Sequence, residues 1–316
     1  MFYVFFMVKT FFQVLLFVLD VITLYVFFRK KSVNLQAKLT CLLIYYMKTL
    51  CLNQALITLE TPIIMGILNI TEDSFFDGGR YISEMAILKR AEEIMEEGAT
   101  LIDLGAVSTQ PNAIEIDEVQ EFEMIKKNLR LLLSHFPQAA VSVDTYRAKV
   151  ADMALTEGAT MINDVSGGKD ADMYDIIGKH QVPYILTHNN RAYPLSTNAL
   201  MANILSFFGA EIEKLKNKGV KDIIIDPGFG FGKTVEQNYY LLNRLETLSI
   251  LNFPILVGVS RKSMIQHVLE TSPAESLTGT ITLNTMAIQH GASILRVHDV
   301  KHGVETLKIL NLLRSL

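Results

Sequence analysis

Short apolar runs and amphipathic stretches alternate along the chain from residue 62 onward. The runs are rich in Ile, Val and Leu and are apolar at nearly every position, which is typical of parallel strands that helices cover on both faces. Between them, stretches such as SEMAILKRAEEIMEEGA (83–99) place charged and apolar side chains on opposite sides of a predicted helix. The predicted strands are residues 62–70, 100–106, 140–145, 160–165, 182–188, 222–228, 253–260 and 293–299.

Eight strand–helix units within about 250 residues predict a (β/α)8 TIM barrel, a fold of the α/β class. A doubly wound open sheet is the alternative, but that fold usually has fewer units and a glycine-rich first turn. Gly98, Gly158 and Gly291 stand where predicted helices end, as expected of short loops that return to a strand. No internal repeat or low-complexity linker interrupts residues 62–316, which indicates a single domain.

The first 46 residues differ in composition from the rest of the chain. Residues 1–28 are extremely apolar, and residues 10–28 are just long enough to span a bilayer. Gln13 and Asp20 interrupt that span, and an aspartate at the centre of a span costs roughly 2.5–3.5 kcal/mol. No small-residue cleavage site follows, so a signal peptide is not expected.

Three interpretations of this extension stay open. Met47 begins a stretch that reads like the natural start of a soluble protein, so a misplaced translation start accounts for the residues upstream. The second interpretation is a membrane anchor, in which the basic run at residues 29–31 keeps the downstream chain in the cytoplasm. The third is a soluble extension. We therefore divide the chain into an apolar extension (1–46) and a barrel domain (47–316), and we expect a cytoplasmic location.

The charge and the cysteine content narrow the class of protein. The net charge is −4 with both signs interspersed, so we expect no nucleic-acid partner. The two cysteines, Cys41 and Cys51, favour a reducing cytosol over a disulfide framework. His298 and His302 are four residues apart, but the residues between them lack the Glu of a zinc-binding helix.

The segment DPGFGFGKT (226–234) ends in Gly-Lys-Thr and at first resembles a nucleotide-binding P-loop. That motif needs a glycine five positions before the second glycine, where this chain has Pro227, and proline has no N–H to donate to a phosphate. The spacing G-x-G-x-x-G fails as well, because Gly228, Gly230 and Gly232 are evenly spaced. The pattern therefore excludes a phosphate-binding loop of either type.

Polar side chains follow almost every predicted strand. The carboxyl ends of the strands form the active site in (β/α)8 barrels, so these side chains should converge on one mouth. They are Asn69, Ser108, Thr109, Asp144, Asn163, Asp164, His188, Asp226, Ser260, Arg261, Lys262, Arg296, His298 and Asp299. Such a concentration of polar strand ends indicates a binding site.

Two kinds of chemistry can be distinguished in this set. Carboxylates, an amide and an ammonium suit a flat, nitrogen-rich heterocycle, and these groups belong to Asp144, Asn163, Asp226 and Lys262. Amide, hydroxyl, guanidinium and imidazole groups suit a phosphorylated group, and these belong to Asn69, Ser108, Thr109, Arg296 and His298. Ser263 lies where a strand runs directly into a helix, a position that favours an anion.

Each residue alone has a purely structural alternative. Asp144 and Asp164 can be N-caps of the helices that follow them. Arg261 can pair with a neighbouring carboxylate, and His298 can fill the rim of the barrel. The convergence of the whole set is what favours a functional site.

The same stretches resemble the dihydropteroate synthase family. The matching segments are MGILNITEDSFFDGG (65–79), GATLIDLGAVST (98–109), VSVDTYRAKVADMAL (141–155), INDVSGG (162–168), IIIDPGFGFGKT (223–234), PILVGVSRKSMI (254–265) and GTITLNTMAIQHGASILRVHDV (279–300). The resemblance implies a barrel, usually a homodimer, that acts as a transferase of folate biosynthesis. Its substrates would be 6-hydroxymethyl-7,8-dihydropterin diphosphate and 4-aminobenzoate, its products 7,8-dihydropteroate and diphosphate, and sulfonamides would compete for the aminobenzoate site.

The resemblance also implies a role for each matching residue. The pterin would be bound by Asp144, Asn163, Asp226 and Lys262. The diphosphate would be held by Asn69, Arg296 and His298, with Mg²⁺ as the cofactor on Asn69. The aminobenzoate side would be shaped by Phe75, Thr109, Phe231 and Ser263. The residues expected to take part in catalysis are Asp144, Asp226, Lys262, Arg296 and His298.

Three positions depart from the family's pattern. Glu72 stands where the family has proline, Gln110 replaces a basic residue, and Thr187 lies in a segment that has lost a methionine expected to pack on the pterin. These departures leave open a pterin-binding paralogue with altered or lost activity. Another pterin-binding barrel, such as a corrinoid-dependent methyltransferase domain, is the second alternative, but it has no need for Arg296 and His298.

Overall fold

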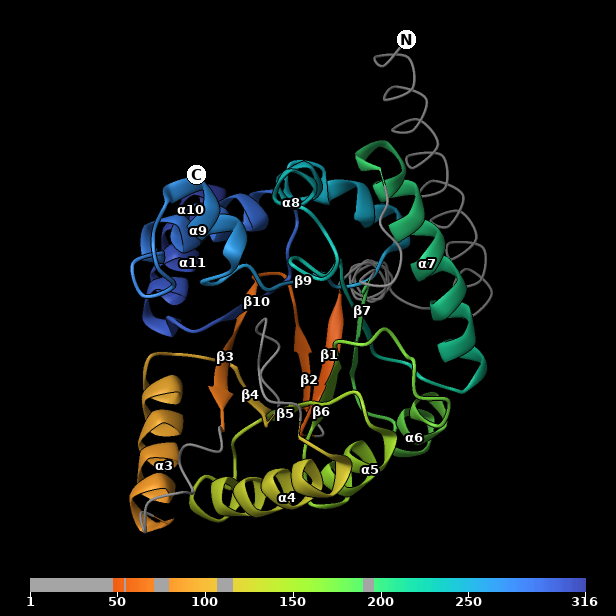
Figure 1. The fold of residues 1–316 in the computed structure, drawn as a ribbon, viewed down its shortest axis with the longest axis vertical. Coiled ribbons are helices and arrows are strands. Elements are labelled where there is room, and N and C mark those ends of the chain that lie inside the picture. The colour runs from red at the N-terminus through yellow and green to blue at the C-terminus, as the bar shows by residue number, and fades with distance from the viewer. Residues whose placement is uncertain (1–47, 54, 71–79, 107–115, 190–195) are drawn as a thin grey trace, which may run out of the picture. The chain divides into compact units, whose positions relative to one another are not determined.

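The computed structural model describes residues 48–53, 55–70, 80–106, 116–189 and 196–316. Its central element is a sheet of eight parallel strands with helices around it (Figure 1). The strands are β3 (Ile63–Asn69), β4 (Leu101–Gly105), β5 (Val141–Asp144), β6 (Met161–Asp164), β7 (Tyr184–Thr187), β8 (Ile223–Asp226), β9 (Leu256–Val257) and β10 (Ile294–Val297). The helices are α3 (Arg80–Glu96), α4 (Glu118–His135), α5 (Ala148–Thr156), α6 (Met173–His180), α7 (Thr197–Asn217), α8 (Val235–Leu242), the 3-10 helix η2 (Leu245–Leu251), α9 (Ser263–Leu269), α10 (Leu277–Gln289) and α11 (Val300–Ser315).

The strands close into a barrel. Their order in the sheet is β8-β7-β6-β5-β4-β3-β10-β9, and each neighbouring pair is parallel. A parallel bridge between Ile225 and Ile255 joins the two outer strands, and the Ile225 amide donates to the Pro254 carbonyl at 3.0 Å. The predicted (β/α)8 barrel is confirmed, and each of the predicted apolar runs contains one of its strands.

Apolar side chains form two separate layers of core. The larger layer lies between the strands and the surrounding helices, which is why the strands are apolar at nearly every position. Because successive side chains along a strand point to opposite faces, alternate residues fill the barrel interior. The interior layer contains Met65, Leu101, Met161, Ile185, Ile224, Leu256 and Ile294, which lie early in their strands. The carboxyl half of the barrel is thereby left to polar side chains.

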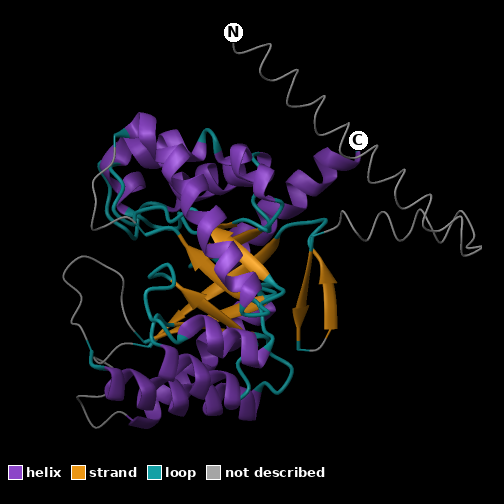
Figure 2. Cartoon of the chain, turned by 90° about the vertical axis from the view of Figure 1, so that its right-hand side faces the viewer, coloured by secondary structure: helices purple, strands orange, loops and turns teal. Residues whose placement is uncertain are grey.

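A β-hairpin that the sequence analysis did not predict packs against the amino end of the barrel. Its strands β1 (Thr49–Leu52) and β2 (Ala55–Thr58) are antiparallel, and Figure 2 shows them beside the barrel strands. The Cys51 amide donates to the Asp222 carboxylate at 3.2 Å, directly before β8. The hairpin and the residue after it contribute Leu50, Leu52 and Leu59 to the interior layer. The hairpin therefore seals the end of the barrel opposite to the polar side chains.

Three of the predicted helix ends have the expected geometry. Gly98, Gly158 and Gly291 have φ angles of 99°, 109° and 96°, which L side chains rarely adopt. The glycines thus end α3, α5 and α10 and turn the chain back into the next strand.

The compact unit that contains the barrel comprises Thr49–Leu316. Residues 1–46, including the candidate anchor at 1–28, lie outside the part of the chain that the structure describes. Within the described ranges, no helix combines the length and the apolar character needed to cross a bilayer.

Candidate active site

The predicted site residues that the structure describes lie at or next to the carboxyl ends of the barrel strands. Asn69, Asp144 and Asp226 are the last residues of β3, β5 and β8. Lys262 immediately precedes α9, and the others are Asn163 in β6, Phe231 after β8, Ser263 at the start of α9, Arg296 in β10 and His298 after β10. Phe75, Ser108 and Thr109 lie outside the described residues. Strand parallelism thus brings residues from six segments to one end of the barrel.

A buried ionic network links the four strands β4, β5, β6 and β10. The Arg296 guanidinium donates from Nη2 to Asp144 at 2.7 Å and from Nε to Asp103 at 2.6 Å. Asn163 donates from Nδ2 to the same Asp103 oxygen at 3.0 Å. Asp103 was not among the predicted site residues, although an aspartate inside the apolar run TLIDLGA was a signal that could have identified it. The network places Asp144, Asn163 and Arg296 in mutual reach.

Two ionisable groups in this network, Asp144 and Arg296, have pKa values far from their ordinary ones. Burial raises the pKa of Asp144 to about 7; the charge of Arg296 opposes this shift, and Asp103 adds to it. Burial also works against the charged form of Arg296, but Asp103 and Asp144 outweigh it, so the pKa of Arg296 lies above its ordinary value. Arg296 therefore stays cationic, while Asp144 changes charge near neutral pH.

Asp226 occupies a second buried position, next to a lysine. Its Oδ1 accepts a hydrogen bond from the Gly228 amide at 2.7 Å. Burial raises the pKa of Asp226, and the charge of Lys262 is the largest influence in the opposite direction. Lys262 Nζ donates to the Phe229 carbonyl at 2.6 Å and lies 4.9 Å from the centre of the Phe231 ring. Asp226, Lys262 and Phe231 thus form one wall of the site.

The loop after β8 uses its lysine and threonine structurally. Lys233 Nζ donates to the carbonyls of Gly228 at 2.8 Å, His188 at 3.1 Å and Phe231 at 3.3 Å. Thr234 is the N-cap of α8, with its hydroxyl accepting from the Gln237 amide at 3.2 Å. The side chains that would serve a phosphate in a P-loop are engaged with the loop itself. These contacts agree with the exclusion of a P-loop that the glycine spacing gave.

His188 helps to hold the loop after β8 through its contact with Lys233. Its Nδ1 lies 3.1 Å from Lys233 Nζ and its Nε2 lies 2.9 Å from Asn203 Oδ1. Burial lowers the pKa of His188 to about 4, and the Lys233 charge lowers it further. The neutral ring thus accepts at Nδ1 and donates from Nε2. His188 therefore has a structural environment, although it follows a barrel strand.

His298 is also neutral at physiological pH. Burial lowers its pKa to about 4, with the charges of Arg296 and Arg261 adding to the effect. Ser260 Oγ accepts from the His298 amide at 3.2 Å and lies 3.1 Å from Nδ1. When the Ser260 hydroxyl donates to Nδ1, the proton of the neutral ring resides on Nε2. His298 can therefore donate one hydrogen bond without carrying a charge.

The comparisons with known proteins agree with this arrangement. The sequence matches the family described as pterin binding enzyme over residues 65–298. Dihydropteroate synthase of Bacillus subtilis is 39% identical over 257 residues, which cover 80% of this chain and 88% of that protein. The chain belongs to the dihydropteroate synthase family.

Solved structures of dihydropteroate synthases have the same fold as this chain. The enzyme of Xanthomonas albilineans, solved with 4-aminobenzoic acid, is 32% identical with a TM-score of 0.80 and covers 85% of this chain and 99% of its own. The enzyme of Yersinia pestis, solved in complex with a sulfonamide drug, is 36% identical with a TM-score of 0.78 and covers 85% of this chain and 100% of its own. The resemblance stated from the sequence is confirmed.

The structural alternatives can now be decided for individual residues of this dihydropteroate synthase family member. Asp144 is not an N-cap, because α5 begins after Arg147, whose side chain makes no cap hydrogen bond. Asp164 accepts from the amides of Ser166 at 2.7 Å and Gly168 at 3.1 Å, so it shapes the loop after β6. The pairing of Arg261 with a carboxylate is confirmed, since it donates to both oxygens of Asp299 at 3.0 Å and 2.5 Å.

The donor set of the site fits a magnesium ion that arrives with a phosphate. Among the described residues, no group of three or more His, Cys, Asp and Glu side chains can hold a metal ion. Mg²⁺ commonly takes one or two protein oxygens and completes its shell with water and substrate phosphate. Asn69 Oδ1 offers such an oxygen, because Asn69 is exposed at the end of β3 and its neighbour in register on β4, Gly105, has no side chain to cover it.

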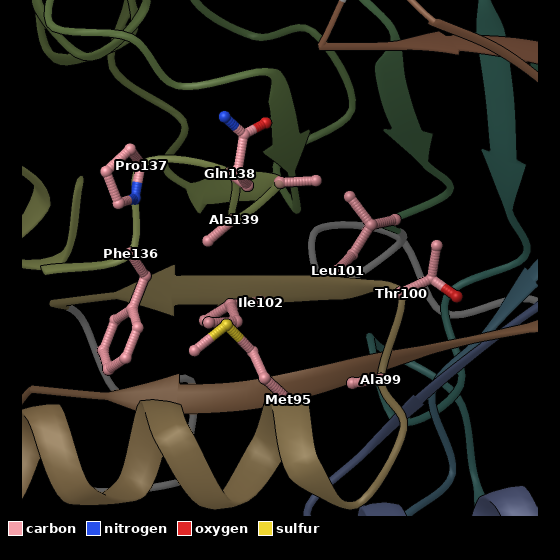
Figure 3. Close-up of a pocket in the computed structure, with 10 residues that line it drawn as sticks. Met95, Ala99, Thr100, Leu101, Ile102, Phe136, Pro137, Gln138 and Ala139 are labelled. Carbon is pink, nitrogen blue, oxygen red and sulfur yellow. The ribbon is translucent and has the colours of Figure 1, made fainter.

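A cavity of about 320 Å³ lies away from these residues. Figure 3 shows its lining, which includes Met95, Leu101 and Phe136 around the start of β4. Because this end of β4 is the amino end of the barrel, the cavity is remote from Asp144 and Arg296. Its mostly hydrocarbon lining also lacks the charged groups that a diphosphate needs. The polar end of the barrel is therefore the candidate active site.

Proposed function

We propose that this chain condenses 6-hydroxymethyl-7,8-dihydropterin diphosphate with 4-aminobenzoate, giving 7,8-dihydropteroate and diphosphate. The observation that carries the proposal is the set of buried carboxylates at the carboxyl end of the barrel, held between Arg296 and Lys262. Membership of the dihydropteroate synthase family and the 4-aminobenzoic acid bound to the Xanthomonas albilineans enzyme support this assignment.

The pterin ring is assigned to the buried polar wall. Asp144 and Asp226 can accept from ring N–H and amino groups, and Lys262 can donate to a ring acceptor. Asn163 offers a carbonyl oxygen, because its amide nitrogen already donates to Asp103. A flat, nitrogen-rich ring provides the complementary donors and acceptors.

Catalysis is assigned to charge placement rather than to a strong base. The bond between the pterin methylene and the diphosphate oxygen breaks, and the diphosphate takes the electron pair. The positive charge that develops on the methylene and the ring lies close to the carboxylates of Asp144 and Asp226, which stabilise it. The lone pair of the aminobenzoate nitrogen then forms the C–N bond, and the nitrogen releases its proton. A neutral arylamine needs no general base for this attack, so positioning accounts for much of the effect.

The leaving group is assigned to donors at the rim. Arg296 carries a permanent positive charge, and His298 can donate from Nε2. Asn69 would hold Mg²⁺, which neutralises diphosphate charge when it is bound. The aminobenzoate side is assigned to Phe231 and Ser263, together with Phe75 and Thr109.

A homodimer is part of the same proposal. The last helix and the residue that follows it expose apolar side chains at helical spacing: Ile309, Leu312, Leu313 and Leu316 are 64%, 64%, 61% and 96% exposed. A continuous apolar stripe on a surface helix is typical of an interaction surface. A second copy of this chain is the partner that the family resemblance implies.

The test is an assay with the purified full-length chain. We expect equimolar dihydropteroate and diphosphate to form from the pterin diphosphate and 4-aminobenzoate, and a sulfonamide to compete with 4-aminobenzoate. Binding of the pterin diphosphate with no diphosphate release after addition of 4-aminobenzoate would instead identify a paralogue that has lost the reaction.

A further inference from the structure

Asp103 is a charged side chain in the interior of a barrel strand. It lies in the middle of β4 and has no exposed surface. A buried carboxylate is unfavourable unless it is paired, and Asp103 finds its partners on β6 and β10 rather than on its own strand. Its other oxygen, Oδ1, is buried and accepts no hydrogen bond from any described residue. Local packing alone does not account for an aspartate at this position.

The two partners of Asp103 are both assigned to the substrates. Arg296 donates from Nε at 2.6 Å, and Asn163 donates from Nδ2 at 3.0 Å, to the same oxygen Oδ2. Because a carboxylate accepts and an amide nitrogen donates, this contact decides which end of the Asn163 amide is turned away from Asp103. The Asn163 carbonyl, buried and without a partner among the described residues, is left for a ligand N–H.

The hydrogen bond to Asp103 also gives the two ends of the Arg296 guanidinium different roles. Nε lies next to the side-chain stem, so its bond to Asp103 holds the plane of the group. Nη2 lies at the tip and donates to Asp144 at 2.7 Å. An incoming anion can take over the tip without breaking the bond at Nε.

We propose that Asp103 is a positioning residue that orients Arg296 and Asn163 together for the pterin diphosphate. Throughout the reaction, Arg296 keeps the hydrogen bond from Nε to Asp103. At the tip, Nη2 exchanges Asp144 for the diphosphate. This inference rests on the proposed function, because it assigns the two oriented side chains to the substrate of that reaction.

The charge of Asp103 also raises the pKa of Asp144. This effect distinguishes a positioning residue, whose loss changes the pH dependence, from a residue that only supports the fold. Asp144 faces Arg296 on β10, Asp103 on β4, Glu121 on α4 and Asp164 on β6. Burial and the three carboxylates raise the pKa of Asp144, and Arg296 lowers it. Replacing Asp103 with Asn removes one negative charge and leaves more of the Arg296 charge to Asp144. Both changes lower the pKa of Asp144, so a rate that needs the Asp144 carboxylate persists to lower pH.

The first experiment compares Asp103→Asn with Ser142→Ala in the full chain. Ser142 pairs in register with Asp103 on β5 and is equally buried, so its loss removes a polar group without removing a charge. We expect kcat/KM of Asp103→Asn to fall about 3- to 30-fold, because the hydrogen bonds from Arg296 and Asn163 then meet a neutral acceptor instead of a charged one, and its acid limb to move to lower pH. Ser142→Ala should keep both within about twofold.

Other outcomes of this experiment overturn the inference. An Asp103→Asn enzyme within about twofold of wild type would show that the orientation is unimportant. An activity loss with an unmoved acid limb, or an equal loss in Ser142→Ala, would show that Asp103 only supports the fold. Calorimetric binding of the pterin diphosphate to both variants separates this question from catalysis: weaker binding in Asp103→Asn alone supports the inference even if the wild type forms no dihydropteroate.

A second measurement follows the wild-type chain and needs a variant only to assign the signal. The Nε–H signal of Arg296 in nitrogen-15 NMR, assigned by its loss in Arg296→Lys, reports the bond to Asp103. We expect slow exchange of this proton with water both before and after addition of the pterin diphosphate. Fast exchange in either state would overturn the inference.

Discussion

At the scale of single residues, the site is defined by where carboxylates are buried and which cations they meet. Asp144 and Asp226 are both buried, and their pKa values are raised mainly by burial. Arg296 opposes the shift for Asp144 and Lys262 opposes it for Asp226. Perturbed acids with specific charged partners at one end of a barrel are typical of an active site. The two carboxylates are suited to stabilise a positive charge on a bound ring.

Replacing Asp226 with Asn tests the role of this carboxylate. We expect turnover to fall by on the order of 10²–10³, because one preorganised charge next to the pterin cation is lost. The affinity for diphosphate should change much less, since Asp226 is assigned to the pterin ring and not to the leaving group. Steady-state kinetics and product inhibition by diphosphate measure the two effects.

The matched control for this variant is Asp222→Asn, four residues earlier at the sealed end of the barrel, where the carboxylate accepts from the Cys51 amide. It should retain near-normal turnover. Activity of Asp226→Asn within a few-fold of wild type would mean that the carboxylate does not act on the reacting ring.

The pH dependence should report Asp144. Its pKa is raised to about 7, so the fraction of carboxylate falls as the pH drops through neutrality. Because the proposed mechanism needs the charged form of Asp144, kcat/KM should fall on the acid side by up to about tenfold per pH unit. His298, with a pKa of about 4, stays neutral in this range and does not contribute. The profile is measured from about pH 5.5 to pH 8.5, and a flat profile would contradict the assignment.

At the scale of elements, the loop between β8 and α8 connects the buried Asp226 to the site wall. Gly228 has a φ of 73°, and a Cβ there would lie 2.0 Å from the His188 carbonyl oxygen. Lys233 closes the loop by donating to three carbonyls, and burial lowers its pKa to about 7. Lys233, a side chain inside the loop, therefore helps to hold the shape of the loop.

Replacing Lys233 with Met should remove this support. Three carbonyls lose a buried donor, so we expect the free energy of unfolding to fall by about 2–4 kcal/mol. We also expect lower kcat/KM, because the loop directly follows Asp226 and contains Phe231. Urea unfolding and steady-state kinetics measure the two effects.

The control is Lys214→Met, which removes a surface ion pair with Glu211 and should change the stability little. A Lys233→Met protein as stable and active as wild type would show that the carbonyls find water instead of Lys233.

At the scale of the whole molecule, the hairpin closes one end of the barrel, and the other end carries the candidate active site. The hairpin adds its leucines to the interior layer, while polar residues occupy the opposite end. The hairpin starts at Thr49, so a chain that begins at Met47 keeps the whole seal.

We predict that residues 1–46 are dispensable. The fragment 47–316 should be soluble and as active as the full chain. A fragment that starts at residue 61 lacks the hairpin, and it should be less stable because the interior layer loses Leu50, Leu52 and Leu59. An insoluble or inactive 47–316 fragment beside an active, membrane-bound full-length protein would contradict this prediction.

The oligomeric state can be tested on the last helix. Leu312→Asp places a charge in the exposed apolar stripe of α11, so we expect a dimer in the wild type and a monomer in the variant. Light scattering measures the mass of both, with Lys308→Asp on the same helix as the charge control. A monomeric wild type, or a variant that stays dimeric, would place the interface elsewhere.

Much of the architecture could be predicted from the sequence alone. Continuous apolar runs with helical stretches between them determine a parallel sheet with helices on its faces, because each strand must be covered on both sides. Once eight such units close into a barrel, the polar residues after the strands must gather at one end. Asp144, Asn163, Asp226 and Arg296 were therefore identified by position before any contact was known.

The partners of these residues were decided by the tertiary structure. The bonds from Arg296 to Asp103 and from Asn163 to Asp103 join residues on β4, β6 and β10. The engagement of Lys233 with carbonyls of its own loop, and the packing of a short hairpin against the amino end, are equally invisible in local patterns. Periodicity reports which face of an element is apolar, so the sequence determined the strands and helices of the barrel and the end at which its polar residues gather. Side-chain pairing depends on the distances between strands far apart in the chain, and only the closed barrel sets those distances.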